Sequence, residues 1–257
     1  MKRVAACLLV AFITTAASQS PTAATAPRQS FQKIKLFEHH GTVVWSCSSS
    51  EVKALIYKSG LAIDADGAFR AYHPNNRLGL DTLKHAGHPG NWWALATDNG
   101  KPDGRPIVQR ANDPAPGYYV SMTALFDRAI PEESNPRRFV DAATIPYVVL
   151  PPEGFEYAKL GDFATVINLQ NAKTAGAIVA DESAAELKMG EGSMALAVKL
   201  AVNSNPRTGG VEHGIAYVVY PDSGNGKPRS LSDIASISEH QFRRWSSQRN
   251  FNACLAN

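Results

Sequence analysis

The chain has 257 residues, of which 44% are hydrophobic and 19% charged, so it holds enough apolar residues for one large domain or two small ones. Removing Lys2 and Arg3 with the N-terminal segment described next leaves 24 of the 26 basic residues against 23 acidic ones. This near-neutral balance argues against nucleic acid as a partner.

Residues 1–18 have the pattern of a signal peptide. Lys2 and Arg3 precede the apolar run VAACLLVAFITTA, and Ala16 and Ser18 occupy the small-residue positions of a cleavage site. A short membrane anchor is the alternative, but the apolar run is too short to span a bilayer. We therefore expect a secreted or periplasmic protein that leaves the membrane once the signal is removed, with residues 19–33 as a polar linker.

The next segments are predicted from their apolar patterns. The stretch SSSEVKALIYKSG (48–60) predicts a short helix, because Ser48 and Glu51 form a capping box and Gly60 follows. Residues 74–117 read as a long ordered loop. Two later helices are expected at 193–202 and 232–246. The strand-like runs are LAID, YYVSMTAL, PYVVLP, FATVINL, AGAIVAD and IAYVVYP.

Six or more short strands with few helices favour a mainly β fold, either a closed barrel or a sandwich. We expect one domain over residues 34–225. A C-terminal helical extension, 226–257, is expected to pack on its outside. A monomer is the expected state.

Cys47 and Cys254 remain after signal removal, an even pair in an oxidising compartment. They predict a disulfide that joins the two ends of the domain, and two free buried thiols are the alternative.

The motifs of common cofactor and metal sites are missing from the sequence. It has no P-loop and no dinucleotide fingerprint, so no cofactor is expected. His85 and His88 lie in a Gly/Pro-rich loop without a second pair at zinc-site spacing, so no metal site is expected either.

Carboxylates dominate the segment 151–195. It carries seven acidic residues against three lysines, and two of the acids, Asp181 and Glu191, stand at the two ends of one loop. An acidic patch on a near-neutral protein suits a cationic ligand, although a solvated acidic face is also compatible with the pattern.

Five further residues are candidates for substrate binding. Trp92 and Trp93 lie in a loop, where indole faces often bind ligands, and adjacent extended residues point to opposite faces, so at most one of them would face a ligand. Asp64 and Asp66 would either bind an amine or shape the turn at Gly67. Asp162 would either orient a catalytic group or form a structural turn.

Several long motifs resemble the fungal-type chitosanases of glycoside hydrolase family 75 over roughly residues 60–222. The resemblance implies endo-hydrolysis of β-1,4-linked glucosamine polymers such as chitosan, with inversion, on a six-stranded double-psi β-barrel. It also implies one essential Asp and one essential Glu, which match Asp181 in AIVAD and Glu191 in GEGS. The loop ADESAAEL departs from the family pattern. The motifs are AIDADGAFRAYHP, GLDTLKHAGHPGNWWAL, TDNGKPDGRPIVQRANDPAPGYYVSMTAL, RRFVDAATIPYVVLP, KLGDFATV, AIVAD and MGEGSMALA.

The two acids suit glycoside hydrolysis, which needs a proton donor at the leaving oxygen and, for inversion, a base about 6.5–9.5 Å away that activates water. Asp181 follows an apolar strand, so desolvation is expected to raise its pKa and make it the acid. Glu191 precedes a helix start, so the helix dipole is expected to lower its pKa and make it the base.

Two other functions remain open. One is a noncatalytic expansin-like polysaccharide-binding protein, which would keep aromatic residues without needing both acids. The other is a hydrolase of the same fold that acts on another amino sugar polymer, such as partly acetylated chitosan or the glycan of peptidoglycan.

Overall fold

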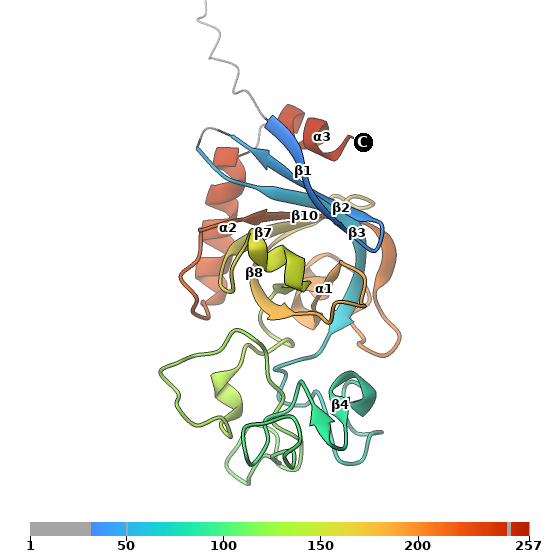
Figure 1. Cartoon of the computed structure of the whole chain (residues 1–257), viewed down its shortest axis with the longest axis vertical. Coiled ribbons are helices and arrows are strands. Elements are labelled where there is room, and N and C mark those ends of the chain that lie inside the picture. Colours follow the sequence, from blue (N-terminus) through green and yellow to red (C-terminus); the bar gives the residue numbers. More distant parts are fainter. Residues whose placement is uncertain (1–31, 50, 246–247, 257) are drawn as a thin grey trace, which may run out of the picture.

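The computed structural model describes residues 32–49, 51–245 and 248–256, and its ribbon is mainly β with few helices (Figure 1). The predicted signal peptide and all but the last two residues of the predicted linker lie outside the described residues. Within the described part of the chain, no helix is both long enough and apolar enough to cross a membrane.

A closed six-stranded barrel forms the centre of the protein (Figure 1). The closing contact is the parallel pairing of β3 with β9, and β6 and β8 are also parallel, while the other barrel pairs are antiparallel. The predicted mainly β barrel is therefore confirmed. In order around the barrel the strands are β3 (Leu55–Asp64), β10 (Val211–Tyr220), β7 (Phe163–Asn168), β8 (Thr174–Glu182), β6 (Tyr147–Leu150) and β9 (Glu191–Ser193).

The hairpin of β1 (Gln32–His39) and β2 (Thr42–Ser48) extends the sheet beside β3. Strand β1 thus begins two residues before the expected start of the domain at 34. The helix predicted for 48–60 is wrong, because Ser49 caps only a tight turn and β3 follows it. Both ends of β3 are buried, with Leu55, Ile56 and Tyr57 at its start and Leu61 and Ile63 near its end, and this tertiary burial overrides the local capping signal.

Alternate residues of the barrel strands pack into two hydrophobic clusters. The short helix α1 (Met194–Lys199) contributes to one of them, and α2 (Leu231–Trp245) lies against β7 and β8 and contributes to the other. Both helices lie close to their predicted positions. A third helix, α3 (Gln248–Leu255), ends the described chain.

The C-terminal segment is part of the core. Trp245 on α2 is fully buried in the same cluster as Cys47 of β2, and the predicted disulfide between Cys47 and Cys254 is present. The segment predicted as an extension is thus attached to the barrel by both packing and a covalent bond.

Residues 65–146 form a separate lobe below the barrel in Figure 1, with little regular structure. The strand predicted for 118–125 is wrong, because this stretch makes only isolated bridges, such as Leu95 with Ser121. The lobe contains two 3-10 helices and one short strand pair: η1 (Leu83–His85), η2 (Pro136–Arg138), and β4 (Gly87–His88) with β5 (Asn91–Trp92). A third 3-10 helix, η3 (Pro152–Glu156), lies outside the lobe and follows β6.

Candidate active site

Strand β6 brings Asp181 and Glu191 to two sides of one residue. Val149 pairs with Asp181 of β8 on one side and with Glu191 of β9 on the other. Residues paired across a sheet point to the same face, so both acids share the face of Val149. Strands lie about 4.8 Å apart, so the two Cα atoms are roughly 10 Å apart in a flat sheet.

A β-bulge sets the direction of Asp181. Val148 pairs with Val179 but Val149 pairs with Asp181, so Ala180 is the extra residue. Without the bulge Asp181 would pair with Leu150 and point to the opposite face. The carbonyl of Ala180 instead accepts a hydrogen bond from the Leu125 amide in the lobe. Bulges redirect side chains beside active sites in this way.

Strand β3 adds a third carboxylate to the same face. Ala62 pairs with Glu191 across the parallel β3–β9 pair, and Asp64, two residues later, points to the same side. Asp66 follows in the turn, and one carboxylate oxygen each from Asp64, Asp66 and Asp181 lie within 4.8 Å of one another. The structure therefore gathers four of the predicted site residues.

Hydroxyl and amide donors hold this acid cluster, which consists of Asp64, Asp66, Asp181 and Glu191. Asp64 accepts hydrogen bonds from the Asp66 amide at 2.7 Å and the Tyr147 hydroxyl at 2.9 Å. Asp66 accepts one from the Tyr72 hydroxyl at 2.7 Å. Both tyrosines are buried, and sequence reasoning missed them because an apolar pattern does not distinguish a core tyrosine from one that binds an acid.

Asp181 is held by the backbone on both sides. Its Oδ1 accepts hydrogen bonds from the amides of Ala124 at 3.0 Å and Glu182 at 2.9 Å. These amides favour the charged carboxylate. Glu191 is partly buried, and no described residue donates a hydrogen bond to it.

Burial raises the pKa of every acid in the cluster. The pKa of Asp64 rises to about 6, and desolvation followed by the charges of neighbouring acids raises those of Asp66, Asp181 and Glu191 well above their usual values. The predicted lowering of the Glu191 pKa is wrong. Helix α1 begins after Ser193 and is only six residues long. Desolvation of Glu191 and the charges of Asp64 and Asp181 raise the Glu191 pKa by more than the dipole of this helix lowers it.

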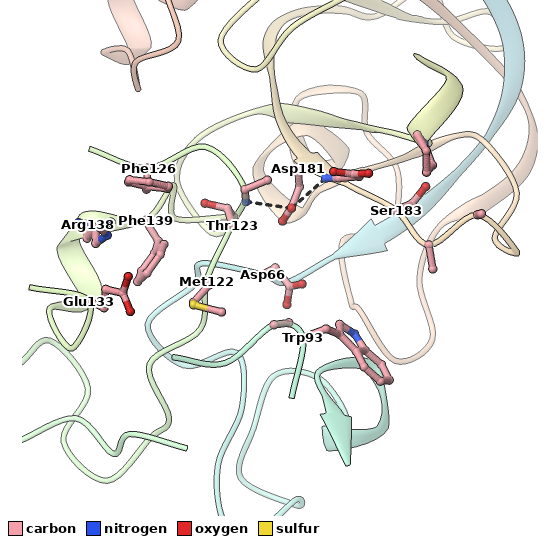
Figure 2. Close-up of a pocket in the computed structure, with 16 residues that line it drawn as sticks. Asp66, Trp93, Met122, Thr123, Phe126, Glu133, Arg138, Phe139, Asp181 and Ser183 are labelled. Carbon is pink, nitrogen blue, oxygen red and sulfur yellow. Dashed lines mark hydrogen bonds between the residues drawn. The ribbon is translucent and has the colours of Figure 1, made fainter. Parts of the chain in front are cut away.

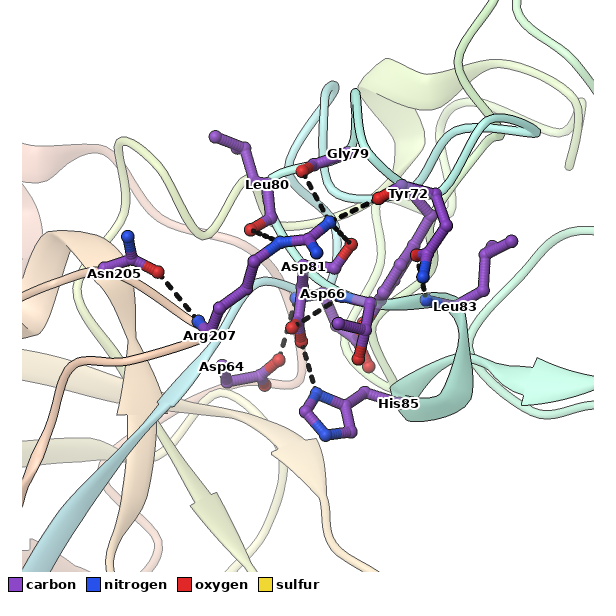
Figure 3. A network of polar contacts seen from close by, with 12 residues as sticks. Asp64, Asp66, Tyr72, Gly79, Leu80, Asp81, Leu83, His85, Asn205 and Arg207 are labelled. Atoms are coloured by element: carbon purple, nitrogen blue, oxygen red, sulfur yellow. Dashed lines mark hydrogen bonds and ion pairs between the residues drawn. The ribbon is translucent and has the colours of Figure 1, made fainter.

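A hydrogen-bonded pair, Asp81 and His85, lies next to the cluster (Figure 3). His85 Nδ1 lies 2.7 Å from Oδ2 of buried Asp81, whose charge raises the pKa values of Asp64 and Glu191, while His85 lowers that of Asp64. Arg207 fixes the loop that carries Asp81 by donating to four carbonyls within residues 76–81. Only the i, i+4 spacing of Asp81 and His85 was visible in the sequence.

A cleft of about 540 Å³ opens beside the acid cluster (Figure 2). Asp66, Asp181 and Trp93 line it, and Trp93 is 53% exposed with its Nε1 donating to the His85 carbonyl. Trp92 instead packs against the hydrophobic core. Trp93 therefore stays a candidate for substrate binding, whereas Trp92, the other tryptophan expected there, lies outside the cleft lining, in keeping with the expectation that at most one of the two faces a ligand.

The close carboxylates also have the oxygen chemistry that a hard cation binds. Asp64, Asp66 and Asp181 form the only such group among the described residues. The raised pKa values of these three acids reflect the same closeness, because carboxylates held this near one another do not all ionise together.

Asp162 lies apart from the cleft-lining residues. Its carboxylate accepts hydrogen bonds from the amides of Lys159, Asp222 and Gly224, so it joins two turns at the ends of β7 and β10. This geometry favours the structural alternative over the predicted role in substrate binding.

We expect Asp162→Asn to keep full activity and to lower the free energy of unfolding by about 1–3 kcal/mol, because one carboxamide oxygen replaces two carboxylate acceptors. Urea unfolding monitored by tryptophan fluorescence measures the loss. A large drop in kcat at unchanged stability would contradict the structural role.

The acid cluster predicts that stability falls as pH rises from 4 to 7. Folded Asp64 has a pKa of about 6, against roughly 3.9 when unfolded, so the native state binds more protons in this window and loses stability as pH increases. The expected contribution is about 3 kcal/mol, from two pKa units.

Asp64→Asn should reduce this slope in urea titrations at several pH values. Asp222→Asn is the control, because lysines lower the Asp222 pKa to about 2 and its effect falls below pH 4. An unchanged slope in Asp64→Asn would show that Asp64 does not titrate in this way.

No protein-family model matches the chain, and no curated protein matches it significantly.

Proposed function

We propose that this protein is a secreted glycoside hydrolase that cleaves β-1,4 linkages between glucosamine units of chitosan, internally and with inversion. The observation that carries the proposal is the placement of Asp181 and Glu191 on either side of Val149 and on one face. In a flat sheet, two such positions have Cα atoms roughly 10 Å apart, which is compatible with the separation of about 6.5–9.5 Å that an inverting pair of carboxyl groups needs to admit a water.

The hydrogen bonds favour Glu191 as the acid and Asp181 as the base. Burial and neighbouring acids raise the pKa of both residues, but two amides stabilise the charged form of Asp181 and offset part of that rise, whereas no described residue donates a hydrogen bond to Glu191. This reverses the assignment expected from the sequence, which had relied on the helix dipole.

The cleft suits a cationic sugar chain. Glu133 and Glu182 add exposed carboxylates to its wall, and Trp93 offers an indole face to a sugar ring or an ammonium group. Because no described helix could span a membrane and a disulfide is present, the features agree with the proposed extracellular site of action.

The test is reducing-end release from chitosans of several degrees of acetylation and from peptidoglycan, with the anomer of the first product followed by NMR. The proposal expects release from chitosan with the α-anomer formed first. Binding without release would favour the expansin-like alternative, and release from peptidoglycan alone would favour the other amino sugar polymer.

Trp93 and Trp92 are expected to respond differently to truncation. Trp93→Ala should raise KM about 2–10-fold with little change in stability, because it loses a stacking face in the cleft. Trp93→Phe keeps an aromatic face, so its KM should stay nearer to that of the wild type.

Trp92→Ala should instead lower the free energy of unfolding by about 2 kcal/mol or more, because Trp92 packs against the core. Steady-state kinetics and urea unfolding separate the two effects, and equal KM values for Trp93→Ala and the wild type would remove Trp93 from binding.

A further inference from the structure

The cleft has two chemically different ends (Figure 2). Asp66, Asp181 and Trp93 lie at one end. At the other end, beyond Met122 and Thr123, a separate group of residues forms the wall. That group consists of Phe126, Glu133, Arg138 and Phe139.

Arg138 is the only basic residue that lines the cleft within the described chain, and it is held rigidly. It is 9% exposed, its guanidinium carbon lies 4.1 Å from the ring centroid of Phe126, and its Nη1 donates to the carbonyls of Ile130 and Pro131. The N-cap residue Asn135 starts the short 3-10 helix η2 that carries it.

The guanidinium has donor capacity that the described residues do not use. The described residues give acceptors only to Nη1. Nε is fully buried and out of reach of a ligand, whereas Nη2 is not fully buried and has no acceptor among the described residues. An arginine at a cleft wall with an accessible, unused donor favours a ligand that brings an acceptor.

Three features of this end together define the ligand. The arginine offers donors, the exposed carboxylate of Glu133 offers an acceptor, and Met122, Phe126 and Phe139 offer an apolar surface. An acetamido group carries a carbonyl acceptor, an N–H donor and a methyl group, which match these three features. The positive charge of Arg138 would repel a glucosamine ammonium group, and the negative charge of Glu133 would repel an anion.

We propose that the Arg138 end of the cleft is a subsite for an N-acetylated sugar unit, while the acid cluster at the other end takes a unit with a free amine. The substrate is then a partly N-acetylated glucosamine chain bound in one direction. This inference rests on the proposed glycan-binding function of the cleft.

The test compares two ligands on a catalytically silenced Glu191→Gln protein: a fully deacetylated glucosamine tetrasaccharide and one whose single N-acetyl group is at a chain end. Calorimetry is expected to show that Arg138→Lys weakens the mono-acetylated ligand about tenfold and changes the deacetylated ligand less than about twofold. Saturation-transfer NMR should place the strongest saturation on the acetyl methyl protons.

Glu132→Gln is the matched variant, because Glu132 is exposed and precedes Glu133 without lining the cleft. Binding of both ligands should change less than about twofold, which separates the effect of Arg138 from a general disturbance of this segment. Circular dichroism checks that each variant is folded. If Arg138→Lys does not fold, the methyl saturation measured on the Glu191→Gln protein, in which Arg138 is intact, still tests the subsite.

The outcomes separate the subsite from the function. Equal weakening of both ligands by Arg138→Lys, or weak methyl saturation in the bound mono-acetylated ligand, would overturn the subsite and leave the proposed hydrolase standing. Failure of both tetrasaccharides to bind would overturn the glycan-binding function, and the subsite with it.

Discussion

Asp181→Asn and Glu191→Gln are each expected to lower kcat on chitosan by roughly 10²–10⁴-fold, the usual contribution of a general acid or base. Each substitution removes a group that transfers a proton while keeping the side-chain volume. Both acids lie on the face of Val149, and neither substitution adds a clash. Reducing-end assays measure kcat, and thermal unfolding checks the fold.

Both variants should also be slightly more stable than the wild type at pH 7. Burial raises the pKa values of these acids, so each costs the folded state stability once the pH exceeds its unfolded-state pKa of about 4. Glu186→Gln is the matched control, because Glu186 is exposed in the same loop, and its activity should be unchanged. Near-wild-type turnover in either cluster variant would remove that residue from catalysis.

A glucosaminide with an activated leaving group distinguishes the acid from the base. Such a substrate needs little protonation, so Glu191→Ala should retain much of its cleavage if Glu191 is the acid, and Asp181→Ala should not. The opposite pattern would restore the assignment suggested by the sequence, with Asp181 as the acid.

The largest expected effect on stability comes from loss of the Cys47–Cys254 disulfide. The two cysteines are 207 residues apart, and in the chain-entropy model closing a loop of that length stabilises by about 5 kcal/mol. This is a large part of the 5–15 kcal/mol that typically separates folded from unfolded domains. The double variant Cys47→Ala/Cys254→Ala should therefore unfold at markedly lower urea concentration.

Reduction of the wild type supplies the control for this experiment. A reducing agent should shift the wild-type midpoint to that of the double variant and leave the double variant unchanged. Part of the loss should come from α2, because Trp245 packs in the same cluster as Cys47. A double variant within about 1 kcal/mol of the wild type would show that packing alone holds the C-terminal segment.

The sequence predicted the barrel strands that run through the core, because continuous apolar runs such as AGAIVAD and IAYVVYP suit strands buried on both faces. It also predicted the disulfide and the position of α2, each from a local or countable pattern. It missed β1, β2 and β9, which are short or less apolar. It also misread residues 48–60 as a helix, because a capping signal is local whereas the burial of β3 depends on distant strands.

The sequence by itself determined which acids stand at the two ends of the loop after β8, and that a pair of tryptophans lies in a loop elsewhere in the chain. Only the tertiary structure decided that Asp181 and Glu191 share a face, because one extra residue at Ala180 turns Asp181 toward Val149. The pKa of Glu191 was decided in the same way. The sequence shows a helix start after it, but burial and the charges of Asp64 and Asp181 come from strands distant in the chain, and desolvation outweighs a short helix dipole.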